Sequence, residues 1–221
     1  MQYYTLIKNI YFTAVSLSFL VSLVSFKWHY PFHLKLFSGL LGLTFLTELF
    51  ATQIGVKYFH WTNNSGIYNS FTIIEFMTYA YYYYCIISVV WIRNIIKGFM
   101  FFFPFFWFIT VFFVFGFDKW NSYVILMGAF FSVCFALGYY YQILKSKKDI
   151  YLLSHPEFWI ATGMLILYSC QLPYFGMLNY LNKNYLILSR SFWVVLLVIN
   201  TCMYLLFTYA FLCKKIHRKY L

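Results

Sequence analysis

Two carboxylates, Glu48 and Glu75, lie inside long apolar stretches of the sequence, where a charged side chain is costly. A carboxylate in such surroundings needs hydrogen-bond donors, a proton or contact with water. Tyr79 follows Glu75 by four residues, and Thr44 and Thr52 flank Glu48 at the same spacing. On helices, each carboxylate would therefore share a face with hydroxyl groups. The pattern indicates either a clamp between two helices or a polar site that binds a ligand or exchanges protons.

The segment between these carboxylates is polar as well. It carries three asparagines, which we expect in a loop over residues 57–70, and Gln171 of a later apolar stretch is expected at the same membrane face. Side-chain amides both donate and accept hydrogen bonds, so they suit directional recognition of a small molecule. The predicted ligand-binding residues are Glu48, Glu75, Tyr79, Asn63, Asn64, Asn69 and Gln171.

Motifs for catalysis or for metal binding are missing from the sequence. The five His residues fall in predicted loops, at span edges or in the tail, and the five Cys residues form no CxxC pair. No HExxH or GxSxG motif occurs, and the last apolar stretch, 191–213, has no Lys that could carry retinal. We therefore expect no catalytic residues, no metal site and no cofactor.

The composition places these polar residues in a membrane. Of the 221 residues, 63% are hydrophobic and 10% are charged, whereas soluble domains carry about 25% charged residues. The charges interrupt apolar runs of about 20 residues, the length that a helix needs to cross a bilayer. Strands of a membrane barrel would instead alternate over about 10 residues. The predicted fold class is therefore all-α, a polytopic transmembrane helical bundle.

We predict one transmembrane domain over residues 1–221, with about seven spans and short connections. The first span is expected to stay uncleaved, because no small-residue cleavage site follows it. The predicted spans are 9–26, 34–56, 71–92, 98–117, 122–144, 157–178 and 191–213.

Charge predicts the orientation. Of the 16 Lys and Arg residues, eleven fall on the side of the C-terminus in this arrangement and five on the other side. Positive residues favour the cytoplasmic side, so we expect the N-terminus outside and the C-terminus in the cytoplasm. The basic residues are scattered through the loops apart from one cluster at the C-terminus, and no nucleic-acid partner is predicted from the net charge of +11.

Two further patterns concern helix shape and packing. Gly128, Ser132 and Ala136 recur at every fourth position and predict a face that a neighbouring helix approaches closely. Pro173 is expected to bend or end the sixth span.

Two stretches carry a resemblance to known proteins: NNSGIYNSFTIIEF over 63–76 and PEFWIATGMLILYS over 156–169. They are similar to a pattern of bacterial seven-span inner-membrane proteins, some of which form the sensory region of histidine kinases. The resemblance implies a multi-pass protein of the bacterial inner (cytoplasmic) membrane that acts as a sensor or an accessory module. It carries over no ligand residues, and any signal is expected to pass to a separate partner.

The expected function is therefore that of a non-enzymatic membrane module, which senses or binds a small ligand, a lipid or a partner subunit through its outer polar cluster. Two alternatives stay open. One is a transporter or channel subunit that uses the intramembrane carboxylates, and the other is a structural subunit of a larger membrane complex. The expected partners are the lipid bilayer and another protein chain or a second copy, with the ligand unidentified.

Overall fold

The computed structural model describes residues 2–27, 30–55, 63–146 and 151–218. Over these ranges the chain forms helices and no strand. The long helices are α1 (Gln2–Ser22), α3 (Phe32–Glu48), α5 (Ser65–Ile86), α6 (Val90–Ile109), α7 (Ser122–Lys145), α8 (Pro156–Asn184) and α9 (Leu186–Arg218). Short elements complete them: α2 (Val24–Lys27), the π-helical turns η1 (Leu49–Ile54) and η2 (Thr110–Phe115), and the 3₁₀ turn η3 (Leu152–Ser154).

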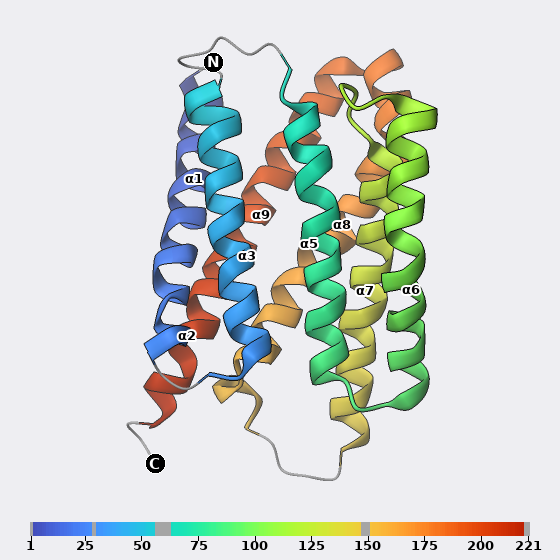
Figure 1. Cartoon of the computed structure of the whole chain (residues 1–221). Helices are drawn as coiled ribbons and strands as arrows, with labels where there is room; N and C mark the ends of the chain where they lie inside the picture. The colour runs from blue at the N-terminus through green and yellow to red at the C-terminus, as the bar shows by residue number, and fades with distance from the viewer. Residues whose placement is uncertain (1, 28–29, 56–62, 147–150, 219–221) are drawn as a thin grey trace.

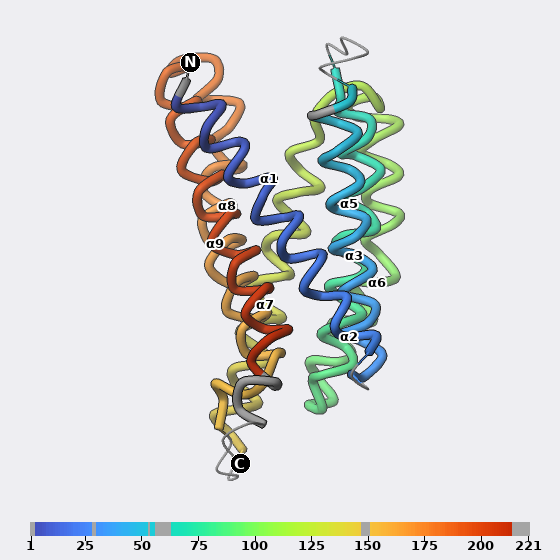
Figure 2. The backbone as a smooth tube through the Cα atoms, turned by 90° about the vertical axis from the view of Figure 1, so that its left-hand side faces the viewer, coloured from blue at the N-terminus to red at the C-terminus, as the bar shows by residue number. Residues whose placement is uncertain are grey.

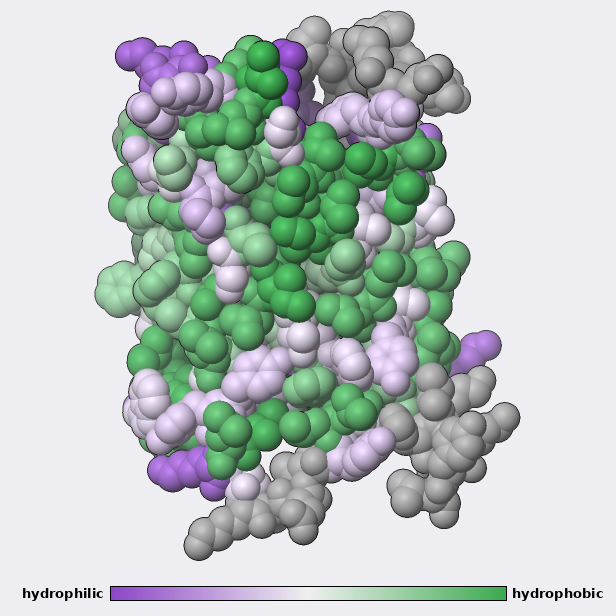
Figure 3. Space-filling model, turned by 180° about the vertical axis from the view of Figure 1, so that it is seen from behind, coloured by the Kyte–Doolittle hydropathy of each residue, from purple (hydrophilic) through white to green (hydrophobic). Residues whose placement is uncertain are grey.

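Six helical stretches of the described residues are long and apolar enough to cross a membrane: Tyr3–Lys27, Phe32–Thr52, Val90–Phe115, Ser122–Lys145, Pro156–Asn184 and Leu186–Cys213. Figure 3 shows the rear face of the bundle, where hydrophobic side chains dominate the middle and hydrophilic ones gather at the upper and lower rims. Such an apolar band between polar rims is what a bilayer requires of the protein surface. The chain is a multi-pass, all-helical membrane protein.

The helix α5 is absent from that set because Asn, Ser, Glu and a run of Tyr lower its hydropathy, although it is 22 residues long. Its length of about 33 Å equals that of a membrane-spanning helix. In Figure 1 it runs through the bundle alongside the others. It packs against α3, α6 and α7, so much of its polar surface faces protein.

The helices alternate in direction, and the chain ends lie at opposite ends of the bundle (Figure 1). We call these the N-end and the C-end after the terminus that each holds. Figure 2 shows α8 and α9 on one side and α3, α5 and α6 on the other. The two sides are joined by α1, which packs on α9 and α3, and by α7, which packs on α8 as well as on α5 and α6.

Most predicted spans coincide with helices, and the fifth span, 122–144, differs from α7 by one residue. One predicted span differs from the structure in detail. The third span, 71–92, runs through a break: α5 begins at Ser65 and ends at Ile86, and α6 begins at Val90. Of the two alternatives expected at Pro173, a bend or an end of the sixth span, the structure excludes the end, because α8 continues through Pro173 to Asn184.

The break between α5 and α6 depends on Gln142 of α7. Ile87 and Val89 have extended backbones, which leaves polar groups of the turn without helical partners. The Gln142 side-chain oxygen accepts hydrogen bonds from the Ser88 amide and hydroxyl, and its Nε2 donates to the Ile86 carbonyl at 3.1 Å. A residue far along the chain therefore completes this turn.

Buried aromatic side chains form much of the core. Phe37 lies at its centre, with ring centroids 5.3 Å from Tyr82 and 5.0 Å from Phe207. The small-residue face of α7 lets α5 approach, since a Cβ on Gly128 would lie 2.3 Å from the Phe76 ring. Gly128, Ser132 and Ala136 are all buried, as their spacing predicts.

Candidate functional site

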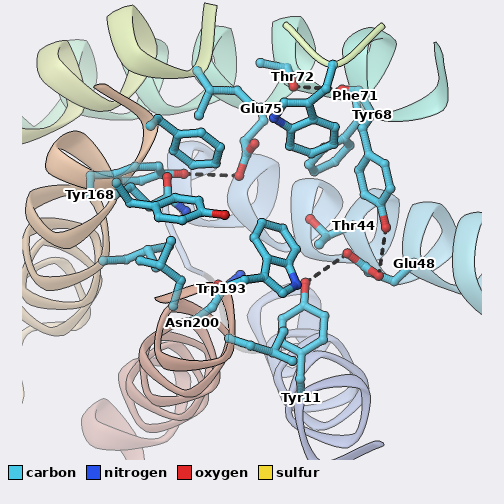
Figure 4. A pocket seen from close by; sticks show the side chains of 18 of the residues that line it. Tyr11, Thr44, Glu48, Tyr68, Phe71, Thr72, Glu75, Tyr168, Trp193 and Asn200 are labelled. Carbon is cyan, nitrogen blue, oxygen red and sulfur yellow. Dashed lines mark hydrogen bonds between the residues drawn. The ribbon is translucent and has the colours of Figure 1, made fainter. Parts of the chain in front are cut away.

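A cavity of about 500 Å³ lies in the half of the bundle toward the N-end. Side chains of α1, α3, α5, α8 and α9 form most of its lining, together with Thr52 of η1, Ile125 of α7 and Trp120 from the connection before α7. Figure 4 shows the polar groups facing one another across this space, with Glu48 and Glu75 on neighbouring walls. Helices from both sides of the bundle therefore contribute to its walls.

Glu48 is the last residue of α3, where the α-helix passes into the π-helical turn η1. Its Oε1 accepts a hydrogen bond from the Tyr11 hydroxyl at 3.0 Å, and its Oε2 accepts one from the Tyr68 hydroxyl at 3.2 Å. Tyr11 belongs to α1 and Tyr68 to α5, so one carboxylate links three helices. Phenol donors of this kind stabilise a carboxylate away from bulk water.

Glu75 has a different arrangement. Its Oε1 accepts from the hydroxyls of Tyr79, at 3.0 Å, and of Tyr168, at 3.1 Å. Tyr79 lies one turn further along α5, whereas Tyr168 comes from α8. Both donors meet the same oxygen, and no side chain or backbone group of the described residues donates to Oε2. One oxygen of this carboxylate is thus left for another partner.

Other polar groups of the cavity differ in whether they have a hydrogen-bond partner. The hydroxyls of Thr44 and Thr72 donate to backbone carbonyls of their own helices, at 2.9 and 2.7 Å. Asn200 of α9 differs, because its Oδ1 is buried and has no hydrogen-bond partner within the described part of the chain. Buried acceptors without a donor are uncommon in proteins, so this atom marks a place where a partner would be stabilising.

The cavity also contains one basic side chain and large aromatic walls. Lys8 of α1 lines it and interacts electrostatically with Glu48. Aromatic side chains make up much of the remaining surface, and two of them are indoles, Trp120 and Trp193. Trp120 packs edge-on against Tyr68, with ring centroids 5.6 Å apart. The walls thus combine charge with broad apolar surfaces, a mixture common in small-molecule sites.

Four of the predicted ligand-binding residues line this cavity: Glu48, Glu75, Asn64 and Gln171. Tyr79 is buried behind Glu75 and donates to it. The structure thus brings together polar residues that lie more than 120 positions apart in the sequence.

Asn63 and Asn69 have a different location. Asn69 was expected in a loop but lies within α5, buried, where its Nδ2 donates to the carbonyls of Phe117 and Lys119 at 2.9 Å each. Asn63 is exposed, donates to the Asp118 carbonyl and accepts from the Ser65 amide. Both asparagines therefore attach the 116–121 connection to the start of α5 rather than facing the cavity.

Several cavity residues were not among the predicted set: Tyr11, Tyr68, Tyr168, Lys8, Trp193 and Asn200. With 23 Tyr in the chain, no pattern distinguishes the phenols that reach a carboxylate from those that only pack. Asn200 carried a usable signal, because it is an amide in the middle of a long apolar stretch.

A second polar cluster lies toward the C-end. His33 Nε2 of α3 is 3.2 Å from Glu157 Oε1 of α8, and His155 Nδ1 is 4.0 Å from the other oxygen. Nearby, the Tyr30 hydroxyl donates to the Phe211 carbonyl at 3.1 Å, and burial raises the pKa of Tyr30 to about 12. The phenol therefore stays protonated at neutral pH, and the cluster connects the two sides of the bundle at this end.

Within the described residues, no group of three or more His, Cys, Asp or Glu side chains could hold a metal ion. The five cysteines form no disulfide within the described residues: Cys85, Cys134 and Cys170 belong to α5, α7 and α8, and Cys202 and Cys213 both belong to α9.

No protein-family model, curated protein or solved structure matches the chain. The fold and the cavity define the class: a multi-pass helical membrane protein with a cavity lined by polar and aromatic side chains. The resemblance to bacterial seven-span sensory proteins stays a prediction from the sequence.

Proposed function

We propose that this protein is a non-enzymatic membrane module that binds a small ligand in the cavity near the N-end. The observation that carries the proposal is a cavity of about 500 Å³ lined by two carboxylates, one of which, Glu75, has an oxygen without a donor among the described residues. Sites for small molecules have volumes of about 300–1,000 Å³ and a few polar groups on mainly apolar walls.

A purely structural role explains these residues less well. Tyr11, Tyr68 and Tyr168 do hold helices together through the carboxylates. A clamp of that kind needs no cavity beside it and would be equally stable with a filled core, because helices in membranes gain stability from close packing. The cavity beside the clamp, and the Glu75 oxygen that has no donor, favour a binding role in addition.

The proposal includes a membrane arrangement. We propose that α5 crosses the bilayer in addition to the six apolar stretches, which gives seven spans, with the N-end outside and the C-end in the cytoplasm. The length of α5 supports the count, and the excess of Lys and Arg toward the C-end supports the orientation. The cavity would then face the outer side of a bacterial inner membrane, and a ligand-dependent signal would pass to a partner protein.

A second candidate, a transporter or channel subunit, is favoured by one observation. The His33–Glu157 pair joins α3 to α8 at the C-end, while the cavity separates the same two sides toward the N-end. An alternating transporter opens its binding site to one side of the membrane at a time, and a bundle joined at one end with a cavity toward the other has this geometry. In this case Glu75→Gln in proteoliposomes would abolish proton-dependent uptake, whereas a receptor would show no uptake at all.

Native mass spectrometry of the gently purified protein tests the binding proposal. We expect a small molecule to accompany the wild-type chain and to be lost from Gln171→Trp, in which an indole replaces a half-buried amide of the cavity wall. Ile166→Trp on the exposed face of the same helix is the matched control and should retain the ligand. Equal occupancy of the two variants, or no bound molecule in any preparation, would refute ligand binding in this cavity.

A further inference from the structure

The polar groups around Glu75 show what kind of ligand the cavity suits. The hydroxyls of Tyr79 and Tyr168 are both engaged at Oε1, so Oε2 is an acceptor that has no donor. Asn200 lines the same cavity, but its Oδ1 is buried and is not exposed to that space. Figure 4 shows Asn200 and Glu75 on walls of the one space. A ligand that donates a hydrogen bond would satisfy Glu75 Oε2.

The distribution of charge adds a second constraint. Lys8 lines the cavity and interacts electrostatically with Glu48. Neither Glu48 nor Glu75 has a Lys, Arg or His within salt-bridge distance in the described part of the chain. The charged group that acts on Glu75 is Glu48, of the same sign. An unbalanced carboxylate away from bulk water is costly, and a cation in the cavity would offset that cost.

Aromatic rings supply the third constraint. Phe71, Trp120 and Trp193 line the cavity, and the electron-rich faces of such rings attract an organic cation within about 6 Å. A monatomic ion would use neither these walls nor a volume of about 500 Å³. An anionic ligand would meet two carboxylates. The three constraints together select a cation with an apolar body.

We propose that the ligand is an organic ammonium compound, an amine whose N–H groups donate to Glu75 Oε2 and whose apolar body lies against the aromatic walls. This inference rests on the proposed ligand-binding function and deepens it.

Three probes that share a phenyl ring and a two-carbon linker test the charge of the ligand: 2-phenylethylamine, 2-phenylethanol and 3-phenylpropionate. Binding to the full-length protein in nanodiscs is measured at neutral pH by calorimetry and by the fluorescence of Trp120 and Trp193. We expect the amine to bind at least about tenfold more tightly than the alcohol, a ratio that one favourable interaction of a charged group provides. The carboxylate probe should not bind.

Two variants assign the ammonium position. Glu75→Gln keeps an acceptor for the tyrosines and should weaken amine binding at least about tenfold while leaving alcohol binding unchanged. Gln171→Lys retains both carboxylates and places a tethered ammonium in the cavity, one turn from Tyr168, so it should also exclude the amine. Glu157→Gln, which neutralises a carboxylate outside the cavity, should bind the amine as the wild type does.

The outcomes separate the two proposals. If alcohol and amine bind equally, and Gln171→Trp abolishes both, the cavity is a binding site but the ammonium inference is wrong. If no probe binds, or if the amine binds Glu75→Gln and Gln171→Lys unchanged, the inference is overturned. Ligand binding as such is then decided by the co-purification experiment: it stands if a molecule accompanies the wild type and is lost from Gln171→Trp. Thermal unfolding of each variant shows whether a loss of binding reflects a loss of fold.

Discussion

The Tyr168 hydroxyl of α8 donates to Glu75 of α5 at 3.1 Å, across 93 positions of sequence. This hydrogen bond ties together the two sides of the bundle next to the cavity. Tyr79, one turn from Glu75, donates to the same oxygen. The pair of phenols therefore holds the carboxylate through one oxygen and leaves the second oxygen without a donor among the described residues.

Replacing Tyr168 by Phe removes this donor with little change in shape. We expect Tyr168→Phe to lower the free energy of unfolding by about 1.5–3 kcal/mol, the usual contribution of a hydrogen bond to a charged group. Thermal unfolding in detergent, followed by circular dichroism, measures the effect. Tyr180→Phe on the exposed side of α8 is the control and should leave the midpoint unchanged. Equal midpoints for the two variants would show that the Tyr168 hydroxyl contributes nothing to stability.

The three-helix contact at Glu48 predicts coupling between Tyr11 and the carboxylate. Tyr11→Phe should destabilise the wild type by about 1.5–3 kcal/mol and should have a clearly smaller effect in a Glu48→Gln background, because a neutral amide is a weaker acceptor. A double-mutant cycle on unfolding midpoints measures the coupling. Additive effects of the two substitutions would contradict a direct interaction.

Close packing of α5 on α7 predicts a strong effect at Gly128. A Cβ there would meet the Phe76 ring at 2.3 Å, so Gly128→Ala should cost about 1–3 kcal/mol through overpacking. Gly98→Ala is the matched control, since a Cβ on Gly98 has no atom within 4 Å. Combining Gly128→Ala with Phe76→Leu should recover part of the loss. Failure of Gly128→Ala to lower the unfolding midpoint would mean that the helices can separate freely at this point.

Cysteine labelling in intact cells tests the proposed seven spans. In a background without native cysteines, Tyr3→Cys and Asp118→Cys should both react with a membrane-impermeant maleimide, because α1, α3, α5 and α6 separate them by an even number of crossings. Ser88→Cys, at the other end of the bundle, should react only after the cells are opened. Labelling of Tyr3→Cys and Asp118→Cys from opposite sides would show that α5 does not cross.

The spans were largely predictable because a bilayer imposes one length and one composition on each helix. α7 illustrates this: the Asn121 side-chain oxygen accepts a hydrogen bond from the Val124 amide and caps the first turn, and the helix ends at Lys145. The boundary between α5 and α6 was not predictable, because residues 86–92 are mainly apolar and contain no Gly or Pro. The groups that stabilise that turn belong to Gln142, far along the chain.

Polar residues inside apolar stretches predicted part of the candidate site for a physical reason. Each needs a hydrogen-bond partner inside the membrane, so polar side chains from different helices come together. This reasoning found Glu48, Glu75 and Gln171. It could not separate Asn64, which lines the cavity, from Asn63 and Asn69, which hold a connection. It also could not select Tyr11, because the helix contact that brings its hydroxyl to Glu48 is a property of the folded bundle.

The Gln142 contact has a consequence for biogenesis. Chain growth delivers α5, the turn at Ser88 and α6 to the membrane before α7 has been synthesised. Until α7 arrives, the exposed turn must rely on water or headgroups for its hydrogen bonds, and the angle between α5 and α6 is set only by their own packing. Arrival of α7 supplies the side-chain amide and the small-residue face together. The hairpin of α5 and α6 thus reaches its final geometry only once the next helix is in place.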